Sequence, residues 1–137
     1  MQINPYLLFD GCCRDAFEFY AECFGGKIDA MISHRGTPAE GHVAPEWVDK
    51  IMHARMTVGV WVLMGSDAPP DRSEGPARGF SVHYGTTDPQ DAVRVFQKLA
   101  EGGTVKMAIQ PTFWASQFGM LVDRFGIPWM VNCEAPR

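Results

Sequence analysis

Apolar residues recur at spacings of three and four in two stretches of the chain, and each stretch stops at a pair of glycines. This spacing puts the apolar side chains on one face of a helix, and glycine is common just past a helix C-terminus. The first predicted helix includes Cys13 and stops at Gly25-Gly26, and the second stops at Gly102-Gly103. Asp88 is placed to cap the second helix, with Pro89 at its first position.

Short runs rich in apolar and aromatic residues surround both helices and are typical of strands. One run precedes each helix and three follow it, so the order β-α-β-β-β occurs twice. The runs are Tyr6–Phe9, Lys27–Ser33, Ile51–Val58 and Val60–Met64 in the first half, and Phe80–Tyr84, Thr104–Ile109, Phe118–Val122 and Ile127–Cys133 in the second. We interpret the pattern as a duplicated supersecondary unit. The predicted fold class is α+β, with two tandem β-α-β-β-β modules.

Two segments rich in glycine and proline interrupt this pattern. Residues 66–79 are the expected connection between the halves, which gives one domain with module one at about 1–68 and module two at about 79–137. Residues 35–50 are too long for an ordinary turn. They form either a functional lid or a mobile connection, and the sequence leaves both readings open.

The composition limits the classes of partner. The 137 residues carry a net charge of −4, which argues against nucleic acid and anionic membrane surfaces. No apolar run approaches the roughly 20 residues of a membrane-spanning helix, and the first residues do not resemble a signal peptide. The four cysteines (Cys12, Cys13, Cys23 and Cys133) lack the spacing of a zinc ribbon or a secreted disulfide framework. We therefore expect a cytoplasmic protein with reduced thiols.

A family resemblance rests on several segments. The most specific are Gln110–Trp114, with its Phe-Trp pair, and Phe118–Trp129, which contains Asp-Arg-Phe-Gly-Ile-Pro-Trp. With Pro5–Gly11, Met52–Met56 and Leu63–Asp67, they resemble the PhnB-like branch of the vicinal oxygen chelate superfamily. That superfamily holds glyoxalase I, bleomycin-resistance proteins and extradiol dioxygenases. The resemblance covers nearly the whole chain and implies two modules that form a curved mixed sheet around a cavity, in a homodimer.

The resemblance also implies where metal ligands would lie. Metal enzymes of the superfamily take His or Glu ligands from the first and last strand of each module. Matching the strands places these positions at Pro5 or Tyr6, Leu63, Ser81 and Met130. None of these side chains is a carboxylate or an imidazole, and a thioether is a poor ligand for hard cations. We therefore expect no metal triad and no cofactor.

The remaining candidates are residues for binding a small molecule. His83 lies two positions after Ser81 and shares its strand face, and His53 and Arg55 are related in the same way and could bind an anionic group. Trp114 is expected near the cavity mouth that the resemblance implies. The full set of candidate ligand-binding residues is Tyr6, His53, Arg55, Ser81, His83, Trp114 and Trp129. For the histidines and tryptophans, an ordinary structural role is the competing interpretation.

Other polar residues are expected to have no part in chemistry. His34 and His42 fall in or beside the long first loop and are expected to be solvated, whereas Cys13 and Cys23 fall on the buried helix stripe. The favoured function is a small-molecule binding protein without metal, and the alternative is a divalent-metal lyase or dioxygenase. A methyltransferase role, attached to some similar sequences, is discounted because the chain has no Gly-rich loop for a methyl donor.

Overall fold

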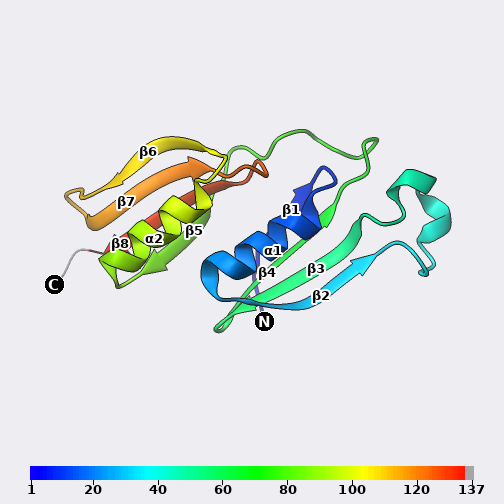
Figure 1. The fold of residues 1–137 in the computed structure, drawn as a ribbon, viewed down its shortest axis with the longest axis horizontal. Helices are drawn as coiled ribbons and strands as arrows, with labels where there is room; N and C mark the ends of the chain where they lie inside the picture. The colour runs from blue at the N-terminus through cyan, green and yellow to red at the C-terminus, as the bar shows by residue number, and fades with distance from the viewer. Residues whose placement is uncertain (135–137) are drawn as a thin grey trace. The chain divides into compact units, whose positions relative to one another are not determined.

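The computed structural model describes residues 1–134, and the chain divides into two compact units, Met1–Glu74 and a second that begins at Gly75. We call these units module one and module two. Module one contains β1 (Tyr6–Phe9), α1 (Cys13–Phe24), β2 (Lys27–Ser33), the short 3-10 helices η1 (Glu40–His42) and η2 (Pro45–Trp47), β3 (Ile51–Val58) and β4 (Trp61–Asp67). Module two contains β5 (Val82–Thr86), α2 (Pro89–Leu99), β6 (Thr104–Gln110), β7 (Ala115–Val122) and β8 (Pro128–Glu134). The predicted α+β fold with its repeated β-α-β-β-β order is confirmed (Figure 1).

Each module forms its own four-stranded mixed sheet. The strand order is β1-β4-β3-β2 in module one and β5-β8-β7-β6 in module two, so the two topologies are the same. In both sheets the first and last strands of the module pair in parallel, and the other neighbours pair antiparallel. Within each module the helix lies across one face of the sheet (Figure 1). An identical order in both halves is what duplication of one unit produces.

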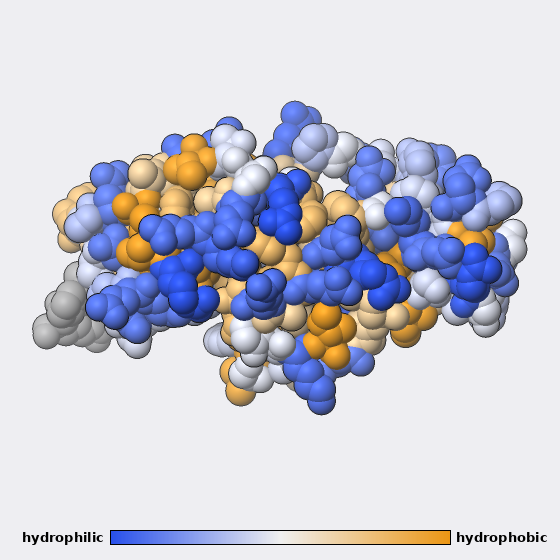
Figure 2. Space-filling model, in the orientation of Figure 1, coloured by the Kyte–Doolittle hydropathy of each residue, from blue (hydrophilic) through white to orange (hydrophobic). Residues whose placement is uncertain are grey.

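The helices form where the apolar periodicity predicts. The stripe of α1 is buried, and Gly25 ends the helix in the left-handed conformation with φ of 66°. Asp88 caps α2 as expected, since its side chain accepts a hydrogen bond of 3.0 Å from the amide of Gln90. The second helix ends at Leu99, three residues before the predicted glycine pair, because the chain already turns there. Hydrophilic residues cover the outward sides of both helices (Figure 2). Neither helix within residues 1–134 has the length and apolar character needed to cross a bilayer.

Pairing between strands moves several of the predicted boundaries. The strand predicted at Val60–Met64 is β4 and continues to Asp67, because its last residues pair with β1 as far as Phe9. The strand predicted to begin at Phe118 is β7 and begins at Ala115, where it pairs with the end of β8. In each case hydrogen bonds from the paired strand extend the element beyond its own local pattern.

Two buried aspartates hold the ends of strands. Asp67, at the end of β4, accepts hydrogen bonds from the amides of Cys13 (2.9 Å) and Ile51 (2.8 Å), which start α1 and β3. Asp123, after β7, accepts from two amides of the turn before β8 and from the indole of Trp129. Buried carboxylates are tolerated when every oxygen is hydrogen-bonded in this way. Asp67 thereby fixes three elements of module one around a single side chain.

Candidate functional site

Module one contains a pocket of about 790 Å³ at one end of its sheet. The strands contribute Leu8, Met52 and Ser66 to the wall, from β1, β3 and β4. The other walls come from the segment between β2 and β3 and from residues 67–72, which follow β4. Leu8 and Ser66 are paired across β1 and β4, on the sheet face opposite to α1. We call this the open face of module one.

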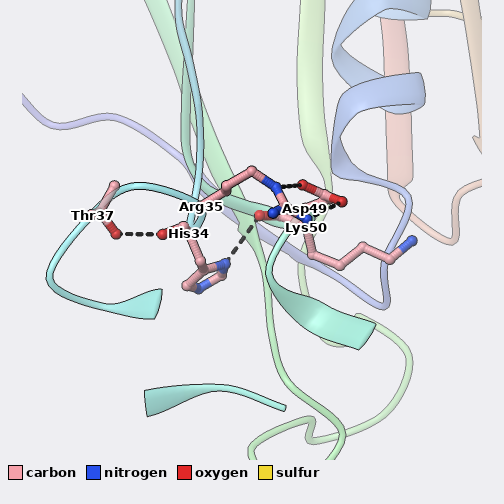
Figure 3. Close-up of polar contacts among 5 residues, drawn as sticks. All are labelled: His34, Arg35, Thr37, Asp49 and Lys50. Atoms are coloured by element: carbon pink, nitrogen blue, oxygen red, sulfur yellow. Dashed lines mark hydrogen bonds and ion pairs between the residues drawn. The ribbon is translucent and has the colours of Figure 1, made fainter. Parts of the chain in front are cut away.

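The segment between β2 and β3 is held closed at its base (Figure 3). The Arg35 guanidinium donates to both oxygens of Asp49, with Nε–Oδ1 at 2.6 Å and Nη2–Oδ2 at 3.0 Å. The hydrogen bond from Arg35 and its charge lower the pKa of Asp49, and both side chains are exposed. The Thr37 hydroxyl donates to the carbonyl of His34, at 2.6 Å. The Arg35–Asp49 pair joins the two ends of the segment, and the Thr37 hydrogen bond fixes its first turn, so the residues between form a loop beside the pocket.

His34 is buried, and the expectation that it is solvated was wrong. Its side chain is only 6% exposed, and it lines the pocket. Its Nδ1 lies 3.0 Å from the carbonyl oxygen of Lys50, which draws the ring inward across the base of the loop (Figure 3). His42 is exposed, as expected for a loop residue. The inward position of His34 depends on a contact sixteen residues away along the chain, which local pattern does not show.

The structure brings together the three candidates of module one. The Tyr6 and His53 rings are stacked with centroids 6.1 Å apart, and the Tyr6 hydroxyl lies 3.4 Å from Nδ1 of His53. Arg55 and Tyr6 both pair with Met64, from β3 and β1, so these side chains share the open face. Arg55 also lies 4.0 Å from the carboxylate of Asp29. A ligand anion would have to compete with that carboxylate for Arg55.

Leu63, the position that the strand matching assigns to a metal ligand, is buried on the side of α1, whereas its neighbour Met64 lies on the open face. Strand residues alternate between faces, so a shift of one residue moves the position to the other side of the sheet.

The candidates of module two do not all face solvent. His83 is exposed on β5 and pairs with Met130 of β8, and Ser81 lies immediately before β5. Trp114 is 49% exposed and packs its ring edge-on against Phe118, at 5.4 Å between centroids. These three residues remain available for contact with a ligand.

Trp129 has a structural role instead. Its side chain is 3% exposed, and its indole N–H donates to the buried carboxylate of Asp123 at 2.9 Å. This arrangement fits the competing interpretation, in which the tryptophan belongs to the core of module two. Trp129 therefore lies outside the surface that a ligand can reach.

The residues at the family's metal positions do not fit a divalent cation. Tyr6 and Met64 are paired on the open face of module one, and His83 and Met130 are the corresponding pair of module two. A phenol, two thioethers and one imidazole are not the His and carboxylate set that a catalytic site needs. Within residues 1–134, no three His, Cys, Asp or Glu side chains lie close enough together to hold a metal. We derive no chemical step through a metal.

The cysteines offer no nucleophile at the pocket. None of the four forms a disulfide within residues 1–134; Cys12 is half-buried and the other three are buried. Burial, with the nearby Asp67 carboxylate, raises the pKa of the Cys13 thiol well above its ordinary value. A neutral thiol inside the core is unreactive, so Cys13 and Cys23 have the core role that the helix stripe predicts.

Comparisons with known proteins agree with the fold and cover nearly the whole chain. The sequence model of a family described as 3-demethylubiquinone-9 3-methyltransferase matches residues 1–132. Protein YjdN of Escherichia coli K12 is 33% identical over 140 residues, covering 96% of this chain and 95% of that protein. The crystal structure of protein PA1353 from Pseudomonas aeruginosa is 46% identical, with a TM-score of 0.90 and 98% of each chain covered. A putative 3-demethylubiquinone-9 3-methyltransferase, PhnB protein, from Bacillus cereus shares the fold at 22% identity, with a TM-score of 0.82. The match covers 97% of this chain and 99% of that chain.

Proposed function

Since the chain belongs to this PhnB-like family of the vicinal oxygen chelate superfamily, we propose that it is a small-molecule binding protein that works without a catalytic metal. The observation that carries the proposal is the pocket of module one, with a volume of about 790 Å³. Ligand pockets of drug-sized molecules have volumes of about 300–1,000 Å³ and mainly apolar walls with a few polar groups. The proposed site matches that description.

The wall chemistry favours a ligand with an apolar body. Leu8 and Met52 supply aliphatic and thioether surface from the sheet, and Trp47 supplies an aromatic ring from the loop. Of the charged lining residues, Glu46, Asp71 and Arg72 are exposed and of both signs, so they give no strong preference for an anion or a cation. Asp67 also lines the pocket, but it is buried and both of its oxygens are hydrogen-bonded to backbone amides. Burial of the apolar part of the ligand would be the main source of affinity.

The proposed binding surface continues along the open face of module one. Tyr6 lies two residues before Leu8 on β1, so its ring follows the pocket on the same face. With His53 and Arg55 it would contact the outer part of a longer ligand. His83, Ser81 and Trp114 are proposed as ligand contacts of module two, and the protein as a cytoplasmic homodimer.

The binding test uses a fluorescent neutral probe, N-phenyl-1-naphthylamine. We expect saturable binding to the wild-type chain and weaker binding by Ala44→Phe, because Ala44 lines the pocket and a phenyl ring there would occupy part of it. Ala77→Phe is the matched control, since residue 77 lies in the connection outside the pocket. Equal affinity of both variants, or no binding by the wild type, would overturn the proposed site.

The metal content of the purified protein tests the proposal that it works without a catalytic metal. Protein prepared without chelators is expected to contain nickel, zinc and iron far below one equivalent per chain. A stoichiometric content of any of them would overturn the metal-free function and restore the lyase or dioxygenase alternative.

A further inference from the structure

His34 presents an unused hydrogen-bond acceptor to the pocket wall. A carbonyl oxygen only accepts hydrogen bonds, so the 3.0 Å contact to the Lys50 oxygen requires a hydrogen on Nδ1 of His34. In the neutral imidazole the other nitrogen, Nε2, then carries a lone pair. Figure 3 shows Nε2 on the side of the ring turned away from Lys50. Within residues 1–134 it has no hydrogen-bond partner.

Most of the His34 residue is buried, but Nε2 keeps surface that another molecule can reach. Within residues 1–134, the buried side-chain nitrogen or oxygen that lacks a hydrogen-bond partner is Nε1 of Trp47, and Nε2 of His34 is not in that class. His34 is 6% exposed and lines the pocket, so the partner missing from the chain can come from a molecule inside the pocket.

The indole N–H of Trp47, a second lining residue, is buried and has no acceptor among the described residues. Trp47 belongs to η2, whereas His34 lies just after β2, so the two residues reach the pocket wall from opposite ends of the loop. The buried indole nitrogen has no surface open to a molecule in the pocket, so Nε2 of His34 is the polar ring atom of the two that a ligand can reach. It is an uncharged acceptor when the imidazole is neutral.

We propose that the pocket of module one takes an uncharged, largely apolar ligand that carries a hydroxyl group, and that Nε2 of His34 accepts the hydrogen of this hydroxyl. The proposal rests on the proposed function, because it names the class of molecule bound at that site. His34 then acts as the residue that selects hydroxylated ligands over hydrocarbons of the same shape.

Three naphthalenes of similar size test the selection by calorimetric titration of the full chain. 2-Naphthol offers a donor and an acceptor, 2-methoxynaphthalene offers only an acceptor, and 2-methylnaphthalene offers neither. We expect 2-naphthol to bind about tenfold more tightly than 2-methoxynaphthalene, since one hydrogen bond to a buried group separates them.

Two substitutions separate the role of His34 in binding from its role in the loop. His34→Asn can still donate to the Lys50 carbonyl from the position of Nδ1, but it has no atom at the place of Nε2. His34→Gln has a polar atom that reaches the place of Nε2, but it lacks the donor to Lys50. We expect the Asn variant to lose the preference for 2-naphthol and the Gln variant to keep a part of it.

The outcomes distinguish this inference from the function on which it rests. If all three compounds bind the wild type equally and His34→Asn changes none of them, the hydroxyl selection is wrong while the pocket stands. If none of the three binds, the pocket is wrong and the selection falls with it. A third outcome would also contradict the selection. In it, His34→Asn loses binding of all three compounds, whereas His34→Gln still binds 2-methylnaphthalene as the wild type does.

Discussion

Asp67→Asn is the substitution that most directly tests how module one holds its pocket. The Asp67 side chain is 4% exposed and accepts two amide hydrogen bonds, from Cys13 at the start of α1 and from Ile51 at the start of β3. Asparagine keeps one oxygen acceptor. Its amide nitrogen would face the second N–H, so two donors would meet where a donor and an acceptor meet now.

The expected cost follows from those two contacts. A hydrogen bond to a charged group contributes about 1.5–3 kcal/mol, and an unsatisfied buried amide adds part of its own desolvation cost. We therefore expect Asp67→Asn to lower the free energy of unfolding by about 2–4 kcal/mol. For a chain of this length the midpoint of thermal unfolding would fall by roughly 6–12 °C.

Urea denaturation followed by tryptophan fluorescence measures this loss, with Asp10→Asn as the control. Asp10 is exposed and has no hydrogen bond or ion pair within residues 1–134, so its substitution removes the same charge without a buried contact. Hydrogen exchange should also become faster at the amides of Cys13 and Ile51. The reasoning is refuted if the two variants unfold at the same urea concentration and exchange at those amides is unchanged.

Three further substitutions test other parts of the fold. Gly65→Ala should lower the free energy of unfolding in urea titrations by about 1–3 kcal/mol, because a Cβ there would lie 2.8 Å from a backbone oxygen of β1. The control is Gly41→Ala, whose Cβ would meet nothing within 4 Å, so this substitution should be neutral. Cys12 should react first with 5,5′-dithiobis(2-nitrobenzoate), and Cys12→Ser should remove the fast phase, because the other thiols are buried. Burial raises the pKa of Asp91, but hydrogen bonds, among them one from Tyr84, outweigh it and leave the pKa below its ordinary value. The wild type should therefore lose more stability than Asp91→Asn as the pH falls below about 4. Equal losses of unfolding free energy in the two proteins over this pH range would contradict this.

The elements were predictable because each is specified by residues close together in the sequence. The buried stripe of α1, the glycine that ends it and the cap at Asp88 all act within one or two helical turns. His34 and Asp67 were not predictable, because their burial depends on partners sixteen or more positions away. A loop rich in glycine and proline ordinarily places its polar residues in solvent. A histidine turned inward by a distant carbonyl leaves no signal in that pattern.

The two modules differ most at one connection, and this difference explains why the pocket lies in module one. Both sheets have the same strand order, so the connection from β2 to β3 corresponds to that from β6 to β7. In module two it is the short stretch 111–114, whereas in module one residues 34–50 fill the same topological position. A long insertion normally costs little loop-closure entropy but gains nothing unless its residues find contacts. Here the Arg35–Asp49 pair and the His34 bond to Lys50 close its base, and the enclosed residues become a wall of the pocket. The duplicated scaffold therefore stays the same in both copies, and the insertion in one copy supplies the proposed binding site.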